Sequence, residues 1–404
     1  MTLFINIGEL AGIAPEGLLR KQGAEMADAG ILRNAWLAEI DGRIVDYGSM
    51  ASCPGAENVV DVAGGMILPA FCDSHTHLVY AGSRDAEFLD KLSGLSYEQI
   101  AARGGGILNS SDLLNSTSED ELLRQSMPRV RELMAKGTGS MEIKSGYGLN
   151  PEGEMKMLRV IRRIKESVRA QVRSTFLGAH AVGRGYGHAD YVQAVIDMMP
   201  EAAGLADYVD VFCDEGFFTP EDTAHILEAG AAYGLRGKIH ANELAVSGGV
   251  QVGVKYGALS VDHLERTTDA EIEVLKGSGT MPVMLPGTSF FLGIPYGRAK
   301  DYIRAGLGIA LASDYNPGSS PSGDMRFVMA LGCIRMGLTP AEAFNAVTIN
   351  GAYAMGLSGV TGSITRGKRA DLILTDPGWT LTKLPYLHHS PFIRSVYLAG
   401  ELLP

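Results

Sequence analysis

The sequence predicts an α/β protein: a (β/α)8 TIM barrel with a small β-sandwich domain built from both ends of the chain. Between residues 67 and 357, short apolar runs rich in β-branched residues alternate with longer stretches of helical periodicity. Most of these runs lie roughly 25–35 residues apart, about the length of one βαβ repeat. Eight such repeats favour a closed parallel barrel over an open sheet. No Gly-x-Gly-x-x-Gly motif follows the first run, which argues against a dinucleotide-binding sheet.

The apolar runs predict the barrel strands, in chain order, at Ala70–His77, Gly139–Ser145, Arg173–His180, Tyr208–Asp214, Lys238–Ala241, Leu259–His263, Thr280–Leu285 and Gly308–Asp314. The helical periodicity predicts helices at Glu119–Lys136, Pro151–Val168, Pro220–Tyr233, Val246–Tyr256, Met325–Met336 and Pro340–Met355. A long excursion from Leu78 to Ser118 follows the first strand and contains Gly104-Gly105-Gly106. Long βα loops usually carry function, so this one is a candidate lid; a plain flexible turn is an equally good interpretation of the glycines.

The flanking segments read differently: residues 29–66 and 359–404 have a texture of short strands and turns. Strands are expected at Trp36–Ile40, Arg43–Tyr47, Val59–Val62, Asp371–Thr375 and Arg394–Leu398. Neither flank is long enough to form a stable sheet alone, so we expect the two to pair. The predicted division is therefore a β-sandwich domain of 1–66 and 358–404 beside a catalytic barrel of 67–357.

Composition narrows the class of protein. The 404 residues carry 35 basic and 46 acidic side chains, a formal charge of −11, which argues against a nucleic-acid partner. The four cysteines, Cys53, Cys72, Cys213 and Cys333, form no paired motif and suggest reduced thiols of a cytosolic protein. No leader-like start and no apolar run of about 20 residues is present. We expect a soluble, cytoplasmic protein with no membrane partner.

Ionisable residues cluster at the predicted strand ends, where parallel barrels place their catalytic groups. His75 and His77 stand two apart on an extended segment, so both imidazoles point to the same side. With His240 and Asp314 at other strand ends they make three nitrogen ligands and a carboxylate. This set suits one Zn²⁺ or Fe²⁺ and leaves a coordination position open.

The position of the lysines indicates how many metal ions the site would hold. Binuclear barrel hydrolases typically add a bridging carboxylated lysine on the fourth strand. Here that strand ends in Asp214, and Lys144 falls on the second. A single metal is therefore favoured, with Lys144 as a structural ion-pair partner.

The motifs resemble those of a known family. His75-x-His77 after Leu68-Pro69, with His240, Asp314 and Gly367-Lys-Arg-Ala-Asp-Leu372, looks like the amidohydrolase superfamily. Five segments resemble, more narrowly, the imidazolonepropionase family of histidine degradation: Asp73-Ser-His-Thr-His-Leu78 with Ala81-Gly-Ser-Arg84, Lys144-Ser-Gly-Tyr-Gly-Leu149, Gly178-Ala-His-Ala181, Leu285-Pro-Gly-Thr-Ser-Phe-Phe-Leu292 and Ser313-Asp-Tyr-Asn-Pro-Gly-Ser-Ser-Pro321. One departure is Val182-Gly-Arg-Gly-Tyr-Gly187, where a proline is expected, which bears on substrate fit beside His180.

The resemblance implies hydrolysis of the ring amide of 4-imidazolone-5-propanoate to N-formimidoyl-L-glutamate, with one Zn or Fe per subunit. It places the metal ligands on His75, His77, His240 and Asp314, and substrate contacts on Arg84, Tyr147, His180, Glu243, His263, Asn316, Gly318 and Ser319. A propanoate tail suits the guanidinium of Arg84 and the hydroxyl of Tyr147. Alternatively, Arg84 forms a surface ion pair with Asp85 or Glu87, and Asn316 to Ser319 form only a turn.

The catalytic hypothesis gives three residues a role. Asp314 accepts the proton of the attacking water, His263 orients that water or stabilises the oxyanion, and Glu243 carries a proton to a ring nitrogen. The alternatives are a helix N-terminal charge for Glu243 and a buried, hydrogen-bonded histidine for His263. Rival functions are a cyclic-base deaminase acting on guanine or cytosine and, far behind, a scaffold without catalysis. We expect a homodimer with a small-molecule substrate.

Overall fold

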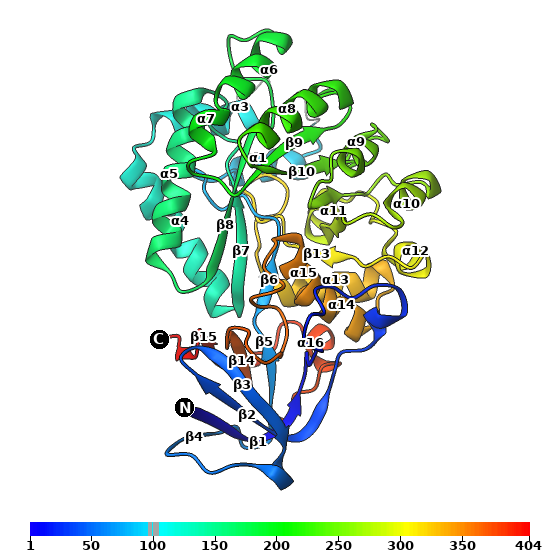
Figure 1. Cartoon of the computed structure of the whole chain (residues 1–404). Helices are drawn as coiled ribbons and strands as arrows, with labels where there is room; N and C mark the ends of the chain where they lie inside the picture. The colour runs from blue at the N-terminus through cyan, green and yellow to red at the C-terminus, as the bar shows by residue number, and fades with distance from the viewer. Residues whose placement is uncertain (96–98, 100–104) are drawn as a thin grey trace.

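A parallel barrel stands above a small β domain in the computed structural model, which describes residues 1–95, 99 and 105–404 (Figure 1). Part of the candidate lid, including Gly104, lies outside the described residues. The barrel sheet has eight strands in the order β13-β12-β11-β10-β9-β8-β7-β6. Their bounds are β6 Phe71–Asp73, β7 Thr138–Lys144, β8 Gln171–Ala179, β9 Tyr208–Cys213, β10 Arg236–Ala241, β11 Ser260–His263, β12 Met281–Met284 and β13 Ala310–Leu311. The predicted barrel is confirmed.

The barrel closes where its first and last strands meet. A parallel bridge joins Thr76 to Tyr315. The amide of His77 donates to the Tyr315 carbonyl at 2.9 Å, and the amide of Asp314 donates to the His75 carbonyl at 3.0 Å. This closure therefore brings residues from opposite ends of the barrel sequence side by side.

Most predicted helices are present. The helices around the barrel are α1 Asp85–Leu92, α3 Ile107–Ser116, α4 Glu119–Ala135, α5 Pro151–Ser167, α6 His188–Asp197, α7 Met199–Ala202, α8 Pro220–Ala232, α9 Gly249–Lys255, α10 Asp269–Leu275, α11 Pro286–Leu292, α12 Ala299–Arg304, α13 Met325–Met336, α14 Pro340–Ala346 and α15 Ile349–Ala354. Two expectations were wrong in detail. The helix expected from Val246 begins only after Gly248, whose φ of 86° is left-handed. The helix expected over 340–355 is two helices, broken at the non-helical Thr348.

Both ends of the chain build the β domain, as predicted. Its mixed sheet has the order β16-β15-β14-β5-β1-β2-β3, with β4 paired to β1. The strands are β1 Thr2–Leu10, β2 Leu32–Ile40, β3 Arg43–Ser49, β4 Asn58–Asp61, β5 Gly65–Pro69, β14 Leu372–Pro377, β15 Ile393–Leu398 and β16 Glu401–Leu402. The short helix α16, Lys383–Tyr386, lies between β14 and β15 in the chain and packs against α13. The antiparallel pair β14–β5 joins the two ends of the chain. A core that includes Phe4, Leu37 and Leu372 packs inside this domain.

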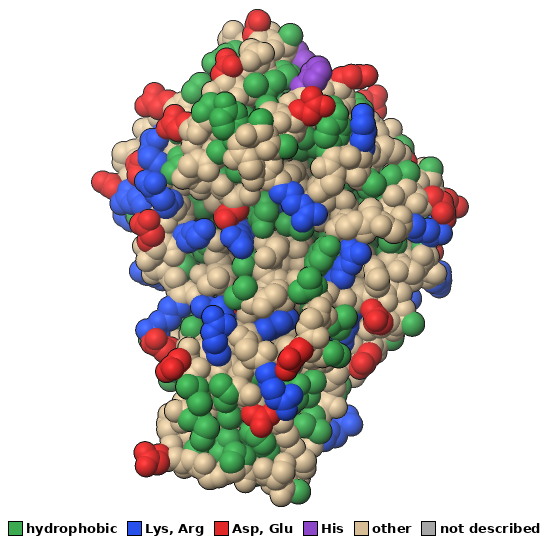
Figure 2. Space-filling model, viewed as in Figure 1, with side chains coloured by type: hydrophobic (Ala, Val, Ile, Leu, Met, Phe, Trp, Pro, Cys, Tyr) green, Lys and Arg blue, Asp and Glu red, His purple; other side chains and the backbone are tan. Residues whose placement is uncertain are grey.

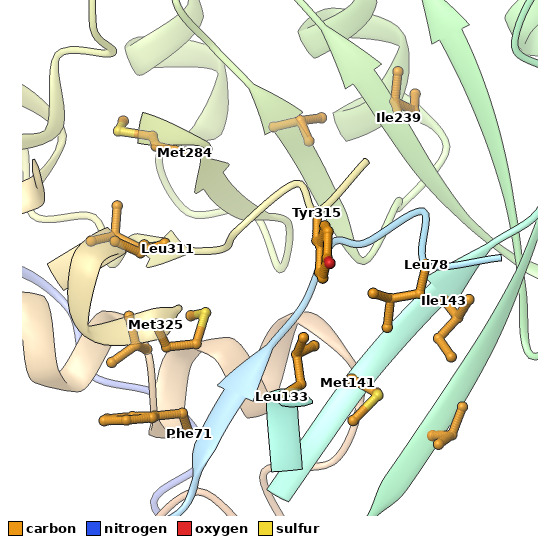
Figure 3. Packing of buried hydrophobic residues seen from close by; sticks show 14 of the residues in the cluster. Phe71, Leu78, Leu133, Met141, Ile143, Ile239, Met284, Leu311, Tyr315 and Met325 are labelled. Atoms are coloured by element: carbon orange, nitrogen blue, oxygen red, sulfur yellow. The ribbon is translucent and has the colours of Figure 1, made fainter. Parts of the chain in front are cut away.

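The main apolar core lies between the barrel strands and the helices outside them. Figure 3 shows Met141 and Ile143 of β7 near Leu133 of α4, all of them fully buried. Figure 2 shows Lys and Arg side chains across the middle of one face, where the barrel meets the β domain, although the net charge is negative. In the described part of the chain, no helix has the length and apolarity needed to cross a membrane.

Candidate metal centre

Three histidines converge at the carboxyl end of the barrel. His75 and His77 follow β6, and His240 lies in β10. Their ligand nitrogens all lie within 4.8 Å of one another, and all three residues are buried. Asp314, just past β13, brings its Oδ1 to 3.6 Å from His75 Nε2 and 3.5 Å from His77 Nε2. The sequence-predicted ligands therefore lie together.

The donor set fits a divalent metal. Burial, and next the charge of Lys144, holds the pKa of His75 well below its usual value; burial and then His180 do the same to His77. These imidazoles are therefore neutral and have lone pairs to offer. Within the described residues, the buried Nε2 of His240 has no hydrogen-bond partner. Neutral imidazoles beside one carboxylate are a ligand set that Zn²⁺ and Fe²⁺ accept.

The backbone at the strand ends is unusual for residues with side chains. His263 has a φ of 85°, Asp314 of 52° and Asn242 of 57°. Such left-handed conformations cost free energy and cluster at functional sites. Asp314 is further fixed by Thr288, whose Oγ1 donates to Asp314 Oδ2 at 2.5 Å. The other carboxylate oxygen, Oδ1, therefore faces the histidines.

His263 sits between two carboxylates. Its Nε2 lies 3.6 Å from Glu243 Oε2, and its Nδ1 lies 3.5 Å from Glu265 Oε1. Burial lowers the pKa of His263, but Glu243 and Glu265 outweigh it and raise that pKa to about 10. Burial also raises the pKa of Glu243. The pair thus combines a cationic imidazole with a carboxyl group that holds its proton more tightly than usual.

His180 and Tyr147 line the same space. The His180 ring stacks on His77 with centroids 5.3 Å apart, and Tyr147 lies 5.6 Å from His180. His180 Nδ1 donates to the Gly146 carbonyl at 2.9 Å, so its Nε2 is the acceptor. Burial, followed by His240, lowers the pKa of His180 to about 3. His180 is accordingly a neutral ring at this site.

The remaining predicted substrate contacts come from two loops. The Arg84 guanidinium donates to Glu87 at 2.9 and 2.6 Å, the ion pair that was the alternative for this residue. It also packs so closely on Gly318 that a Cβ there would clash. Asn316 completes a turn: its Oδ1 accepts from the amides of Gly318 and Ser319, both at 2.8 Å. The turn alternative for Asn316 is therefore present in the structure.

Sequence reasoning missed several groups that surround the ligands. Asp262 Oδ2 accepts from His75 Nδ1 at 2.6 Å. Asp210 Oδ2 lies 3.0 Å from His240 Nδ1, off the line of an ideal hydrogen bond. Lys144 pairs with Glu142 at 2.6 Å and Asp210 at 2.7 Å, which confirms its structural role. A signal existed in the sequence: charged residues interrupt otherwise apolar strands within the last four residues of β7, β9 and β11.

Comparison with known proteins places the chain in a family. The model of the amidohydrolase family matches residues 218–403. The imidazolonepropionase of Flavobacterium johnsoniae is 51% identical over 410 residues, covering 100% of both chains. The chain belongs to the imidazolonepropionase family. The member of that family from Geobacillus kaustophilus is 41% identical and covers 90% of this chain and 88% of its own.

Solved structures show the same fold. Guanine deaminase of E. coli matches with a TM-score of 0.75 at 15% identity and covers 100% of this chain and 99% of its own. The 5-methylcytosine deaminase of Klebsiella pneumoniae, with bound 5-fluorocytosine, reaches 0.74 at 15% identity, covering 98% and 97%. At such identity these likenesses concern the fold alone. Membership of the imidazolonepropionase family rests on the much closer sequence relatives.

Proposed function

We propose that this chain hydrolyses the ring amide of 4-imidazolone-5-propanoate to N-formimidoyl-L-glutamate, the third step of histidine degradation. The observation that carries this proposal is 51% identity to an imidazolonepropionase over the whole of both chains. The convergence of His75, His77 and His240 supports it, because a metal ion bound there can activate water for hydrolysis. The expected homodimer and the cytoplasmic location remain predictions.

The proposal includes one divalent metal per subunit, Zn or Fe. His75, His77, His240 and Asp314 would hold it. When bound, such an ion supplies Lewis acidity toward water and toward the ring carbonyl. Neutral imidazoles would leave part of the ion's positive charge uncompensated, which favours its Lewis acidity.

The chain's own residues then move the protons. Asp314 takes the proton of the attacking water on Oδ1, the oxygen that faces the histidines. Glu243 carries a proton to the departing ring nitrogen, a role that its raised pKa suits. His263, cationic between Glu243 and Glu265, donates from Nε2 to the oxygen on which negative charge develops.

Substrate recognition uses a second group of residues at the site. Arg84 and Tyr147 receive the propanoate, because a guanidinium and a phenol both donate to carboxylate oxygens. His180 contacts the ring through Nε2, the nitrogen left as acceptor because Nδ1 donates to the Gly146 carbonyl. Gly318 and Ser319 present the turn that Asn316 completes. Gly318 holds the guanidinium of Arg84 close, since no side chain intervenes.

The second candidate is a cyclic-base deaminase, which the fold alone would allow. Guanine deaminase and 5-methylcytosine deaminase share the fold with TM-scores of 0.75 and 0.74. Ammonia release from guanine or cytosine, with no formimidoylglutamate from the imidazolone, would establish the deaminase instead.

The test is an assay for formimidoylglutamate on purified wild-type protein and on Asp314→Asn. We expect turnover by the wild type and a loss of at least about 100-fold in kcat for the variant, since a proton acceptor is removed. Asp324→Asn is the matched control, because Asp324 caps the start of α13, where asparagine caps equally well, and its ion pair with Lys136 is long, at 3.9 Å. Wild-type activity in Asp314→Asn would rule out Asp314 as the proton acceptor.

A further inference from the structure

A layer of charged side chains fills the barrel beneath the metal ligands. Barrel interiors are usually packed with branched apolar residues. Here the inward positions carry five charged groups, all fully buried: Glu142 and Lys144 on β7, Asp210 on β9, Lys238 on β10 and Asp262 on β11. Burying a charge is costly unless it is paired and hydrogen-bonded. A layer of this kind therefore needs a function or a complete set of partners.

The layer is closely paired. Lys144 Nζ lies between Glu142 Oε1 and Asp210 Oδ2, at 2.6 and 2.7 Å. Lys238 Nζ pairs with Glu142 Oε2 and donates to the Ser74 carbonyl at 3.0 Å. Both lysines also approach Asp262 Oδ2, at 3.8 and 3.9 Å. Three carboxylates face two ammonium groups, which leaves one formal negative charge under the metal centre.

Two carboxylates of the layer contact the proposed histidine ligands of the metal. Asp262 Oδ2 accepts from His75 Nδ1 at 2.6 Å, and Asp210 Oδ2 lies 3.0 Å from His240 Nδ1. Within the described residues, the Nδ1 of His77 has no hydrogen-bond partner. A carboxylate at Nδ1 fixes the proton on that nitrogen and leaves Nε2 as the lone-pair donor.

We propose that Asp262 and Asp210 are positioning residues for the metal. They hold the Nδ1–H tautomers of His75 and His240 and turn both Nε2 atoms toward the ion. Lys144, which lies 2.7 Å from Asp210 Oδ2 and 3.8 Å from Asp262 Oδ2, in turn holds the two carboxylates in place. The layer's residual negative charge adds to the attraction for a dication. This inference does not depend on the identity of the substrate.

The test measures metal affinity in the absence of substrate. Asp262→Asn and Asp210→Asn conserve volume and remove the charge. We expect each variant to raise the dissociation constant for Zn²⁺, measured by competition with a chromophoric chelator, by roughly 10–100-fold. In ¹⁵N-histidine spectra of the metal-free protein, His75 is expected to lose its fixed Nδ1–H signal in Asp262→Asn.

Asp371→Asn is the matched control. Asp371 is also buried and pairs with Arg369 at 3.0 Å, but its partners lie outside the layer. We expect lower stability and an unchanged Zn²⁺ affinity for that variant. If the two test variants do not fold, Ser260→Ala removes only the hydroxyl that donates to Asp262 Oδ1 and should raise the constant by less. Wild-type affinity in every folded variant would overturn the proposal, whatever the enzyme's substrate.

Discussion

Arg84 shows how one side chain can combine an ion pair with a proposed recognition role. Its guanidinium donates two hydrogen bonds to Glu87 and rests on Gly318 of the loop beyond Asp314. The positive charge also acts on the buried hydroxyl of Tyr147, opposing the rise in pKa that burial causes. Glu87 thus holds the guanidinium at the place where a substrate carboxylate would meet it.

Removing that guanidinium should impair binding rather than chemistry. For Arg84→Ala we expect a KM roughly 10–100-fold higher with little change in kcat, because a hydrogen bond to a charged group is worth about 1.5–3 kcal/mol. Steady-state kinetics on the imidazolone measure this. Arg124→Ala is the control: Arg124 forms the same two-bond ion pair with Glu121, but on an exposed helix surface. A KM equal to that of the control would show that Arg84 does not bind the substrate carboxylate.

At the level of single residues, the sequence predicts the histidines of the site but not the carboxylates that contact their ring nitrogens. His75 and His77 were predictable because a two-residue spacing and a strand end fix their direction. Asp262 and Glu265 were not, since which carboxylate meets which ring nitrogen depends on the register between neighbouring strands. For Asn316, the substrate-contact and turn interpretations used the same residues, and only the structure shows that its side chain accepts hydrogen bonds within the turn.

Strands and helices were predicted well where periodicity is long and poorly where it is interrupted. α4 and α5 agree with expectation to within a residue or two. The first and last barrel strands are much shorter than predicted, because β6 and β13 give way to the irregular backbone that carries the ligands. β1 was missed altogether, since a segment at the chain end gives no flanking turn signals on one side.

The close approach of α15 to β6 supports the strand that precedes His75. A Cβ at Gly351 of α15 would clash with the Cys72 carbonyl. We expect Gly351→Ala to lower the free energy of unfolding by roughly 1–3 kcal/mol, despite alanine's better helix propensity. Denaturant titration measures this. Gly359→Ala is the control, since nothing lies within 4 Å of a Cβ there. Equal stability of the two variants would show that α15 can move away at little cost.

At the scale of the whole molecule, a bound metal would join segments that are distant in the chain. A ligand that binds only the folded state stabilises it by about 2.7 kcal/mol at 100 times its dissociation constant. We therefore expect chelation to lower the melting temperature of the metal-loaded protein, as measured by scanning calorimetry. In His240→Asn, which lacks one of the proposed ligands, the chelator should change the melting temperature much less. An equal shift in both proteins would count against this metal site.

The bridge between Thr76 and Tyr315 also has a consequence for the nascent chain. His75 and His77 leave the ribosome long before Asp314, which is needed to complete the ligand set. At roughly 5–20 residues per second, about 10–50 s separate the synthesis of these residues. During that interval the chain has the histidines of the proposed site but not its carboxylate. A metal held by all four proposed ligands would therefore be bound only after the last barrel strand is in place.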